Sequence, residues 1–168
     1  MKSSLSLVMS FALLWGCASQ QPPEFYSEGQ LVQTESRQVE STGPGVTAVS
    51  VEQNETGQYT FSVTIESEET GCDRYANWWE VITEEGTLLY RRILAHSHVD
   101  EQPFTRSGGP VEIAADDVVI VRSHMHPTGY HTQAMKGSFT TGFAPVILPA
   151  DFAPELAEAD PLPTGCTF

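Results

Sequence analysis

The sequence predicts an all-β protein, an antiparallel β-sandwich of about seven strands that follows an N-terminal tether. Apolar and polar residues alternate with a period of two in short runs between residues 46 and 142. Turn-forming residues separate these runs, and no amphipathic pattern of helical length precedes a weak, acidic stretch at 151–159. Short alternating runs of this kind favour two packed sheets over a helical or mixed fold.

The clearest strand is predicted at 59–65, where Tyr59, Phe61, Val63 and Ile65 alternate with polar residues. A tight hairpin at 84–86 joins the third and fourth strands, and a proline opens the short fifth one, which suits an edge strand. The other predicted strands lie around 49–51 and at 77–83, 87–94, 110–113, 118–123 and 136–141.

Residues 1–16 are expected to be a signal peptide. Lys2 precedes an apolar run at 5–15, and the run ends in Leu14-Trp15-Gly16-Cys17. This ending resembles the lipobox of bacterial lipoproteins. The resemblance implies cleavage before Cys17, diacylglycerol on its thiol and an acyl chain such as palmitate on its amine.

Trp15 departs from the lipobox pattern, in which a small residue is usual. An ordinary secretory leader cut near Ala18 is therefore the alternative. By the family's sorting habit, alanine at position 18 favours the outer membrane. The resemblance thus implies a lipid-anchored protein of the bacterial cell envelope that faces the periplasm or the cell surface.

Residues 17–45 are rich in Gln, Ser, Glu, Thr, Pro and Gly, which predicts a flexible tether before a sandwich domain at 46–148. Once Cys17 is set aside, Cys72 and Cys166 remain, and an even pair in an exported chain predicts a disulfide. The bond would pack the C-terminal tail, 149–168, back on the domain and contribute about 4–5 kcal/mol in a chain-entropy treatment. Two free thiols, or one metal-ligating thiol, are the alternatives.

The strand pattern at 46–142, with a tryptophan on the third strand, resembles immunoglobulin-like and fibronectin type III-like sandwich domains. The resemblance implies that the fourth and sixth strands run the same way on either side of the third. His96 and His98 follow the fourth strand, and His124 and His126 follow the sixth. All four histidines are therefore expected at one end of one sheet.

Strand parity adds a constraint on which side chains share a face. If Trp79 and Val81 face the core, Trp78 and Glu80 face outward, and the same reasoning puts Arg92, Arg122 and the four histidines on the outer face. Trp78, Arg92 and Arg122 would then form a ligand face suited to a protein or glycan partner.

Two His-x-His pairs that converge are suited to a metal ion. Histidines two apart on a strand lie roughly 6–7 Å apart at the backbone, and imidazole nitrogens can close on one ion at about 2.0–2.1 Å. His131 and Met135 follow on the next segment as further ligand candidates. Imidazoles suit copper or zinc, and a thioether would favour copper(I). The alternative is that the histidines are buried and hydrogen-bonded to loop carbonyls.

The composition narrows the class of partner. With 22 acidic against 8 basic residues and a net charge of −14, the chain is poorly suited to nucleic acid. Ser97 and Ser123 point away from their neighbouring histidines, so nucleophilic catalysis finds little support. We expect a lipid-anchored exported protein that binds copper or zinc, more readily than an enzyme. The alternative is a non-catalytic adhesion or complex-forming module that binds a protein or glycan.

Overall fold

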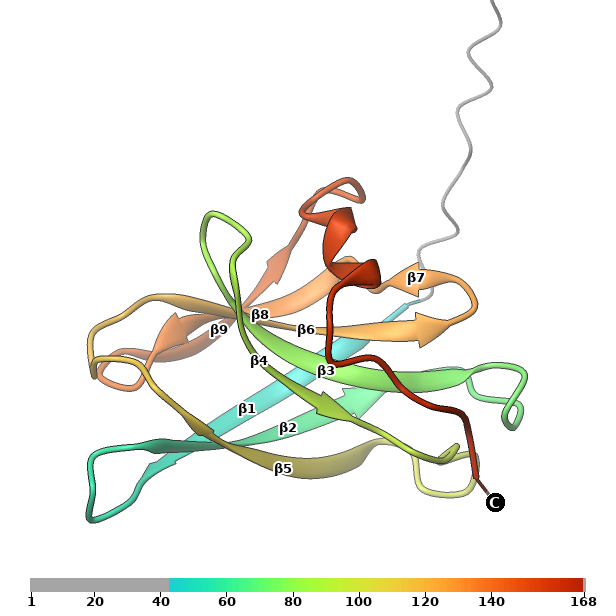
Figure 1. Cartoon of the computed structure of the whole chain (residues 1–168), viewed down its shortest axis with the longest axis horizontal. Coiled ribbons are helices and arrows are strands. Elements are labelled where there is room, and N and C mark those ends of the chain that lie inside the picture. Colours follow the sequence, from blue (N-terminus) through green and yellow to red (C-terminus); the bar gives the residue numbers. More distant parts are fainter. Residues whose placement is uncertain (1–42, 168) are drawn as a thin grey trace, which may run out of the picture. The chain divides into compact units, whose positions relative to one another are not determined.

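A computed structural model describes residues 43–167 and confirms the all-β sandwich-like fold (Figure 1). The signal peptide, Cys17 and all but the last residues of the predicted tether lie outside the described residues. The strands are β1 (Gly45–Gln53), β2 (Tyr59–Glu66), β3 (Tyr75–Thr83), β4 (Leu88–Ile93), β5 (Phe104–Val111), β6 (Val119–His126), β7 (Gly129–Tyr130), β8 (Gln133–Ser138) and β9 (Gly142–Ile147). A short 3-10 helix, η1 (Pro154–Glu158), follows.

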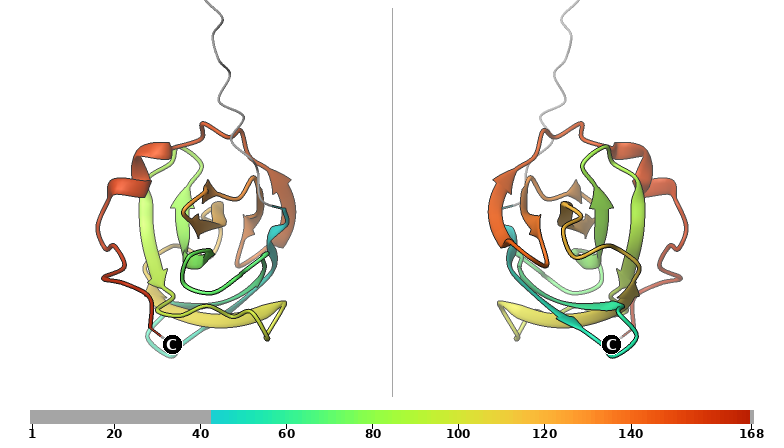
Figure 2. Two further views of the ribbon diagram at one scale, coloured as in Figure 1. Left: turned by 90° about the vertical axis from the view of Figure 1, so that its right-hand side faces the viewer. Right: turned by 90° about the vertical axis from the view of Figure 1, so that its left-hand side faces the viewer.

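Seven of the strands form one hydrogen-bonded path in the order β4-β3-β6-β8-β1-β2-β5, with β7 beside β6 and β9 beside β8. β8 and β1 are joined by a single parallel pair, Gly45 with Gln133, whereas the other pairs are antiparallel. The path folds into two layers, β4-β3-β6-β8 and β1-β2-β5, which enclose the core (Figure 2). The expected placement of β3 between β4 and β6 is thus present.

The core between the layers is formed by the inward-facing residues, which alternate along a strand such as β2 with outward-facing ones. Phe61, Val63 and Ile65 on β2 are fully buried, and Trp79 on β3 is buried opposite them. Gly108 on β5 permits the layers to approach closely, because a Cβ there would lie 2.6 Å from the Tyr90 hydroxyl oxygen. Each large apolar side chain buried in this way contributes about 1.5–3 kcal/mol.

β3 is buried on both faces, which a two-layer sandwich alone does not explain. The chain after β9 runs along the outside of β4 and β3 and carries η1 over that face (Figure 2). We call residues 148–167 the C-terminal segment. It builds a second apolar cluster against the sheet, formed by Ile82, Ile120, Ala134, Leu148 and Leu156.

The end of the C-terminal segment is joined covalently to the domain. Cys72 and Cys166 form a disulfide with a Cα–Cα distance of 5.6 Å, across 94 residues of chain. The predicted bond is confirmed. It ties the segment to the loop between β2 and β3, next to the start of the strand that carries both buried tryptophans.

Several strands differ from the sequence prediction, among them β7, which was not predicted, and β8, which lies three residues before the predicted strand at 136–141. β5 begins at Phe104, six residues before the predicted strand, because residues 104–108 pair with β2 and the Ser107 hydroxyl bonds that of Ser62 at 2.7 Å. The Gly-Gly-Pro sequence at 108–110, which indicates a turn, lies inside this strand. β9 was not predicted, since Pro145 weakens the pattern, but β9 pairs with β8 from the edge of the sheet. Over the described part of the chain, no helix is long and apolar enough to cross a membrane.

Candidate functional site

The five histidines fall into two separate groups. His96 and His98 lie against each other, with ring centroids 4.5 Å apart. His124 instead stacks on Trp78 on the outer face of β3, at 3.8 Å between centroids. Among residues 43–167, no three or more His, Cys, Asp or Glu side chains are placed to hold a metal ion together. The predicted single cluster of four histidines is therefore wrong.

The path of the chain after β4 explains why the pairs do not meet. β4 ends at Ile93, and the following loop turns toward β5 in the opposite layer. His98 accordingly stacks on Phe104, the first residue of β5, with centroids 3.8 Å apart and planes within 10°. His124 and His126 stay on β6, opposite residues of β3. Strand order alone does not specify the direction of this loop.

The predicted parity of β3 and β6 is correct, but the outer face they share is covered. Arg122 lies opposite Glu80, and His124 lies opposite Trp78. All but His124 are nevertheless buried: Trp78 is 3 % exposed, Arg122 1 % and Glu80 0 %. Arg122 bonds carbonyls of the C-terminal segment, and Trp78 is packed against Arg91 and His124, so this face does not offer Trp78 and Arg122 to a partner.

An ionic cluster forms beneath the C-terminal segment. The Glu80 carboxylate accepts hydrogen bonds from Arg91 Nη2 at 2.6 Å and Nε at 2.8 Å, and from Arg122 Nε at 2.8 Å. Other guanidinium N–H groups donate to main-chain carbonyls of the C-terminal segment, those of Phe152, Ala153, Leu156, Ala159 and Pro161. One carboxylate faces two guanidinium groups, and the remaining N–H groups are satisfied by carbonyls, which such burial requires. We call Glu80, Arg91 and Arg122 the buried ion cluster.

Arg91, rather than the predicted Arg92, belongs to this face. A register shift between Val81 and Ile82 accompanies the pairing of β3 with β4, and it leaves Arg91 opposite Glu80. Tyr90 then points inward and packs against the core, whereas Arg92 is exposed. Leu88, Leu89 and Tyr90 are consecutive apolar or aromatic residues at the start of β4. The sequence therefore did not decide which of them face inward.

The remaining ligand candidates lie apart from His96 and His98. Met135 is 6 % exposed and packs in the core, where its thioether is surrounded by apolar side chains. His131 is 1 % exposed, and its Nδ1 hydrogen-bonds the Ser123 hydroxyl at 2.9 Å. Burial lowers the pKa of His131 to about 4. His126 is exposed, with its ring 6.0 Å from that of Tyr75.

His124 is fixed by neighbours on both sides. Its Nδ1 hydrogen-bonds the Asn77 side-chain oxygen at 2.7 Å, and Tyr130 meets its ring edge-on with centroids 4.9 Å apart. Burial, and then the Arg91 guanidinium, lower the pKa of His124 to about 3. This imidazole is therefore neutral at pH 7 and packed as an aromatic side chain.

His98 differs because it is buried without polar contacts to its ring. It is 3 % exposed, and neither ring nitrogen has a hydrogen-bond partner. Burial lowers the pKa of His98, and the nearby Arg106 guanidinium lowers it further. A neutral imidazole with free nitrogens is the form that coordinates metals. His96 beside it is exposed, so the pair opens to solvent on one side.

Glu69 holds the backbone of this histidine pair, a role that the sequence analysis missed. One carboxylate oxygen accepts from the Ser67 hydroxyl at 2.9 Å and the Ala76 N–H at 3.2 Å. The other accepts from the Ser97 hydroxyl at 2.8 Å and from the His98 N–H. Glu69 stands in an acidic run of the sequence that is typical of solvent-exposed loops, which gave no sign of burial.

One further carboxylate lies near the pair. Glu101 interacts electrostatically with both imidazoles, although Arg106 holds it through two hydrogen bonds of 3.0 and 2.7 Å. The side chain of Glu101 is 58 % exposed. The site thus consists of two imidazoles, and water would have to complete the coordination of an ion.

Comparison with known proteins gives one curated match. The chain is 39% identical over 90 residues to a protein of Halomicrobium mukohataei (strain ATCC 700874 / DSM 12286 / JCM 9738 / NCIMB 13541) named "Putative lipoprotein". The aligned part covers 54% of this chain and only 43% of that relative's length. No protein-family model and no solved structure matches the chain.

Proposed function

We propose that this chain is a lipid-anchored exported protein of the cell envelope whose His96–His98 pair binds copper or zinc. The anchor is supported by the sequence Leu14-Trp15-Gly16-Cys17 and by the similarity to a protein named as a lipoprotein. The Cys72–Cys166 disulfide agrees with export, because disulfides persist in oxidising compartments.

The observation that carries the metal proposal is His98, a buried imidazole without a ring hydrogen bond, 4.5 Å from a second imidazole. A polar group buried in this way costs about 1–3 kcal/mol unless it gains a partner. A metal ion shared with exposed His96 supplies one. Because Met135 lies in the core, the thioether that would favour copper(I) is not at this site, so zinc(II) and copper(II) are the ions to test.

The metal proposal is tested by calorimetric titration of the full chain in detergent with zinc(II) and copper(II). The His96→Ala variant should lose binding, and since His96 is exposed its folding should be unaffected. His126→Ala is the matched control, because His126 is exposed as well but lies on β6. It should bind as the parent does.

Three results would count against this proposal. Absence of binding to the parent chain at micromolar ion concentrations would refute metal binding. Equal losses of metal binding in both variants would indicate one site shared by the two histidine pairs. Loss in His126→Ala alone would move the site to β6.

The anchor is tested independently of the metal. Cys17→Ser removes the thiol that would carry the lipid, so the chain should no longer fractionate with membranes or incorporate labelled acyl chains. Cys72→Ser is the control, because it alters the disulfide and leaves Cys17 in place. A Cys17→Ser chain that stays in the membrane fraction and takes up the label would refute lipidation at this cysteine.

A further inference from the structure

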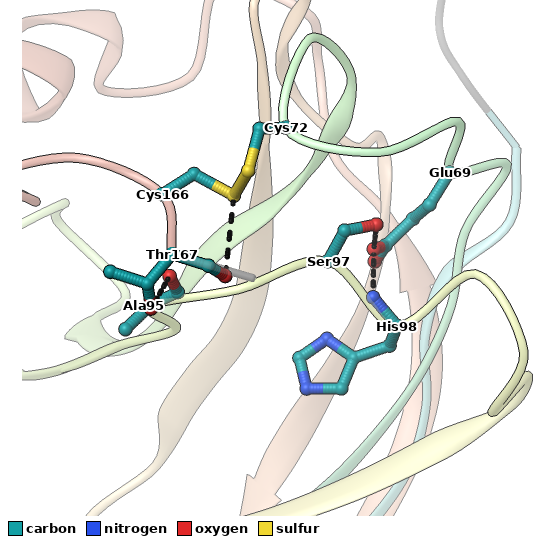
Figure 3. Close-up of a disulfide and its surroundings, with 7 residues drawn as sticks. All are labelled: Glu69, Cys72, Ala95, Ser97, His98, Cys166 and Thr167. Atoms are coloured by element: carbon teal, nitrogen blue, oxygen red, sulfur yellow. Dashed lines mark hydrogen bonds between the residues drawn. A yellow bond between two sulfur atoms is a disulfide. The ribbon is translucent and has the colours of Figure 1, made fainter.

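The loop that carries His96 and His98 is held by hydrogen bonds on both sides of His96. The Cys72–Cys166 disulfide links the two segments that make these hydrogen bonds (Figure 3). Before the pair, the Ala95 carbonyl accepts hydrogen bonds from the Thr167 N–H at 2.7 Å and the Thr167 hydroxyl at 3.1 Å. After His96, the Ser97 hydroxyl and His98 N–H donate to Glu69. The loop is therefore held on both sides of His96.

The disulfide joins these two contacts. Thr167 directly follows Cys166, and Cys166 is bonded to Cys72, three residues after Glu69. The chain between Glu69 and Cys72 is short and tight, since the Thr70 N–H bonds the Arg74 carbonyl at 3.0 Å. If the disulfide were opened, the segments that hold the loop on the two sides of His96 would no longer be linked covalently.

We infer that the Cys72–Cys166 disulfide controls metal affinity at the His96–His98 pair, so that opening the bond weakens binding. This inference rests on the metal site proposed above. The disulfide, Glu69 and Thr167 act as positioning groups, because the chain rather than the sulfur atoms contacts the imidazole loop. Loss of such outer contacts lowers metal affinity by about 10–100-fold in known sites.

The reaction that opens the bond is thiol–disulfide exchange with a dithiol. A thiolate of the dithiol attacks one sulfur, and the second thiol releases the mixed disulfide. Cys72 and Cys166 each gain a hydrogen and are reduced, and the dithiol is oxidised to its cyclic disulfide. Both cysteines are half-buried, which leaves the bond partly accessible to a small dithiol.

The remaining contacts of the C-terminal segment limit how far it moves after reduction. Arg91 and Arg122 hold its residues 152–161 through main-chain carbonyls. Reduction should therefore release the end that carries Thr167 and leave the cover over β3 in place. The predicted effect is a local loosening of the histidine loop rather than unfolding of the domain.

The test compares zinc(II) affinity of the full chain in detergent before and after opening the disulfide. The protein is reduced with a dithiol, the two thiols are alkylated so that they cannot bind zinc, and the reagents are removed. Affinity should fall by about 10–100-fold. His96→Ala should abolish zinc binding in the closed form.

Two variants leave the disulfide intact and guard against unfolding of the opened form. Glu69→Gln weakens the contacts after His96, and Thr167→Pro removes the N–H and hydroxyl before it. Thr164→Ala, an exposed site in the same segment, is the control. Reduced zinc affinity in both variants, with parent affinity in the control, supports the inference.

The outcomes separate the inference from the proposed function. No zinc binding to the closed parent chain refutes the metal site itself. Zinc binding of equal strength in the closed and opened forms leaves the metal site intact and overturns control by the disulfide. If circular dichroism shows that the opened form has lost its β-structure, unchanged affinity in both Glu69→Gln and Thr167→Pro overturns it instead.

Discussion

Two buried polar sites of this molecule are built in opposite ways. In the buried ion cluster, the Glu80 carboxylate is matched by two guanidinium groups whose other N–H groups reach carbonyls. At the histidine pair, His98 is nearly as buried but its ring makes no hydrogen bond. The first site has no bonding capacity left for a ligand, whereas the second has kept it. The first arrangement is suited to a structural role, and the two unsatisfied ring nitrogens of His98 are the atoms that we propose a metal ion would engage.

The largest expected effect comes from breaking the ion cluster. Glu80→Gln leaves two buried guanidinium groups without a counter-charge, so the free energy of unfolding should fall by about 3–5 kcal/mol in urea denaturation. Glu84→Gln removes a carboxylate that pairs at the surface with Lys136 and should cost less than about 1 kcal/mol. Equal losses in the two variants would show that burial of the cluster contributes nothing to stability.

Acid should destabilise the fold through the buried histidines. The folded pKa of His124 is about 3 and that of His131 about 4, both below the ordinary value, so protons bind the unfolded chain preferentially. Stability is then full above pH 6.5 and falls by about 1.4 kcal/mol per pH unit for each histidine below it. The loss from His131 ends near pH 4 and that from His124 near pH 3.

The measurement is the free energy of unfolding at half-unit steps from pH 7.5 to 5, with a chelator present to exclude metal. Most carboxyl groups stay ionised in this range, so the slope reports histidines. His124→Gln should remove that histidine's share of the slope and leave the shares of His131 and His98, and His126→Gln, a change at an exposed position, should leave the slope unaltered. A flat profile in the parent chain would contradict the buried, neutral state of both imidazoles.

A smaller effect on stability is expected at the histidine pair. His98→Phe replaces an unpartnered polar ring with an apolar ring of similar shape, stacked on Phe104 as before. Such exchanges are nearly neutral or stabilising, so the free energy of unfolding should change by less than about 1 kcal/mol while zinc binding is lost. A loss of several kcal/mol would show that the imidazole nitrogens are already satisfied in the folded protein.

The smallest effect is expected at the Arg106–Glu101 pair, whose side chains are 27 % and 58 % exposed. Arg106→Gln should alter stability by less than about 1 kcal/mol. It should nevertheless raise the pKa of His98, since the guanidinium charge is one of the causes that lower it. Titration of the His98 ring by nuclear magnetic resonance measures this shift, and an unchanged pKa would exclude the electrostatic contribution of Arg106.

Local patterns in the sequence were sufficient for most of the strands and for the faces of β2, β3 and β6. The alternation at 59–65 identified β2, and the parity that turned Trp79 inward also turned Arg122 and His124 outward, as the register shows. The disulfide followed from the cysteine count alone. The strand features depend on residues that are close in the sequence. The disulfide depends on two cysteines that, once Cys17 is set aside, can pair only with each other, so the sequence determined both.

Only the tertiary structure decided which outward side chains are covered and which histidines meet. Glu80 and Arg122 are 42 residues apart, and the carbonyls that complete their cluster come from the C-terminal segment. Likewise, Glu69 reaches the His98 N–H across 29 residues. A charged residue in the sequence carries no mark of burial, because its desolvation is offset by partners that only the folded chain brings close. The direction of the loop after β4 separated the two histidine pairs for the same reason: long-range packing, rather than strand order, positions it.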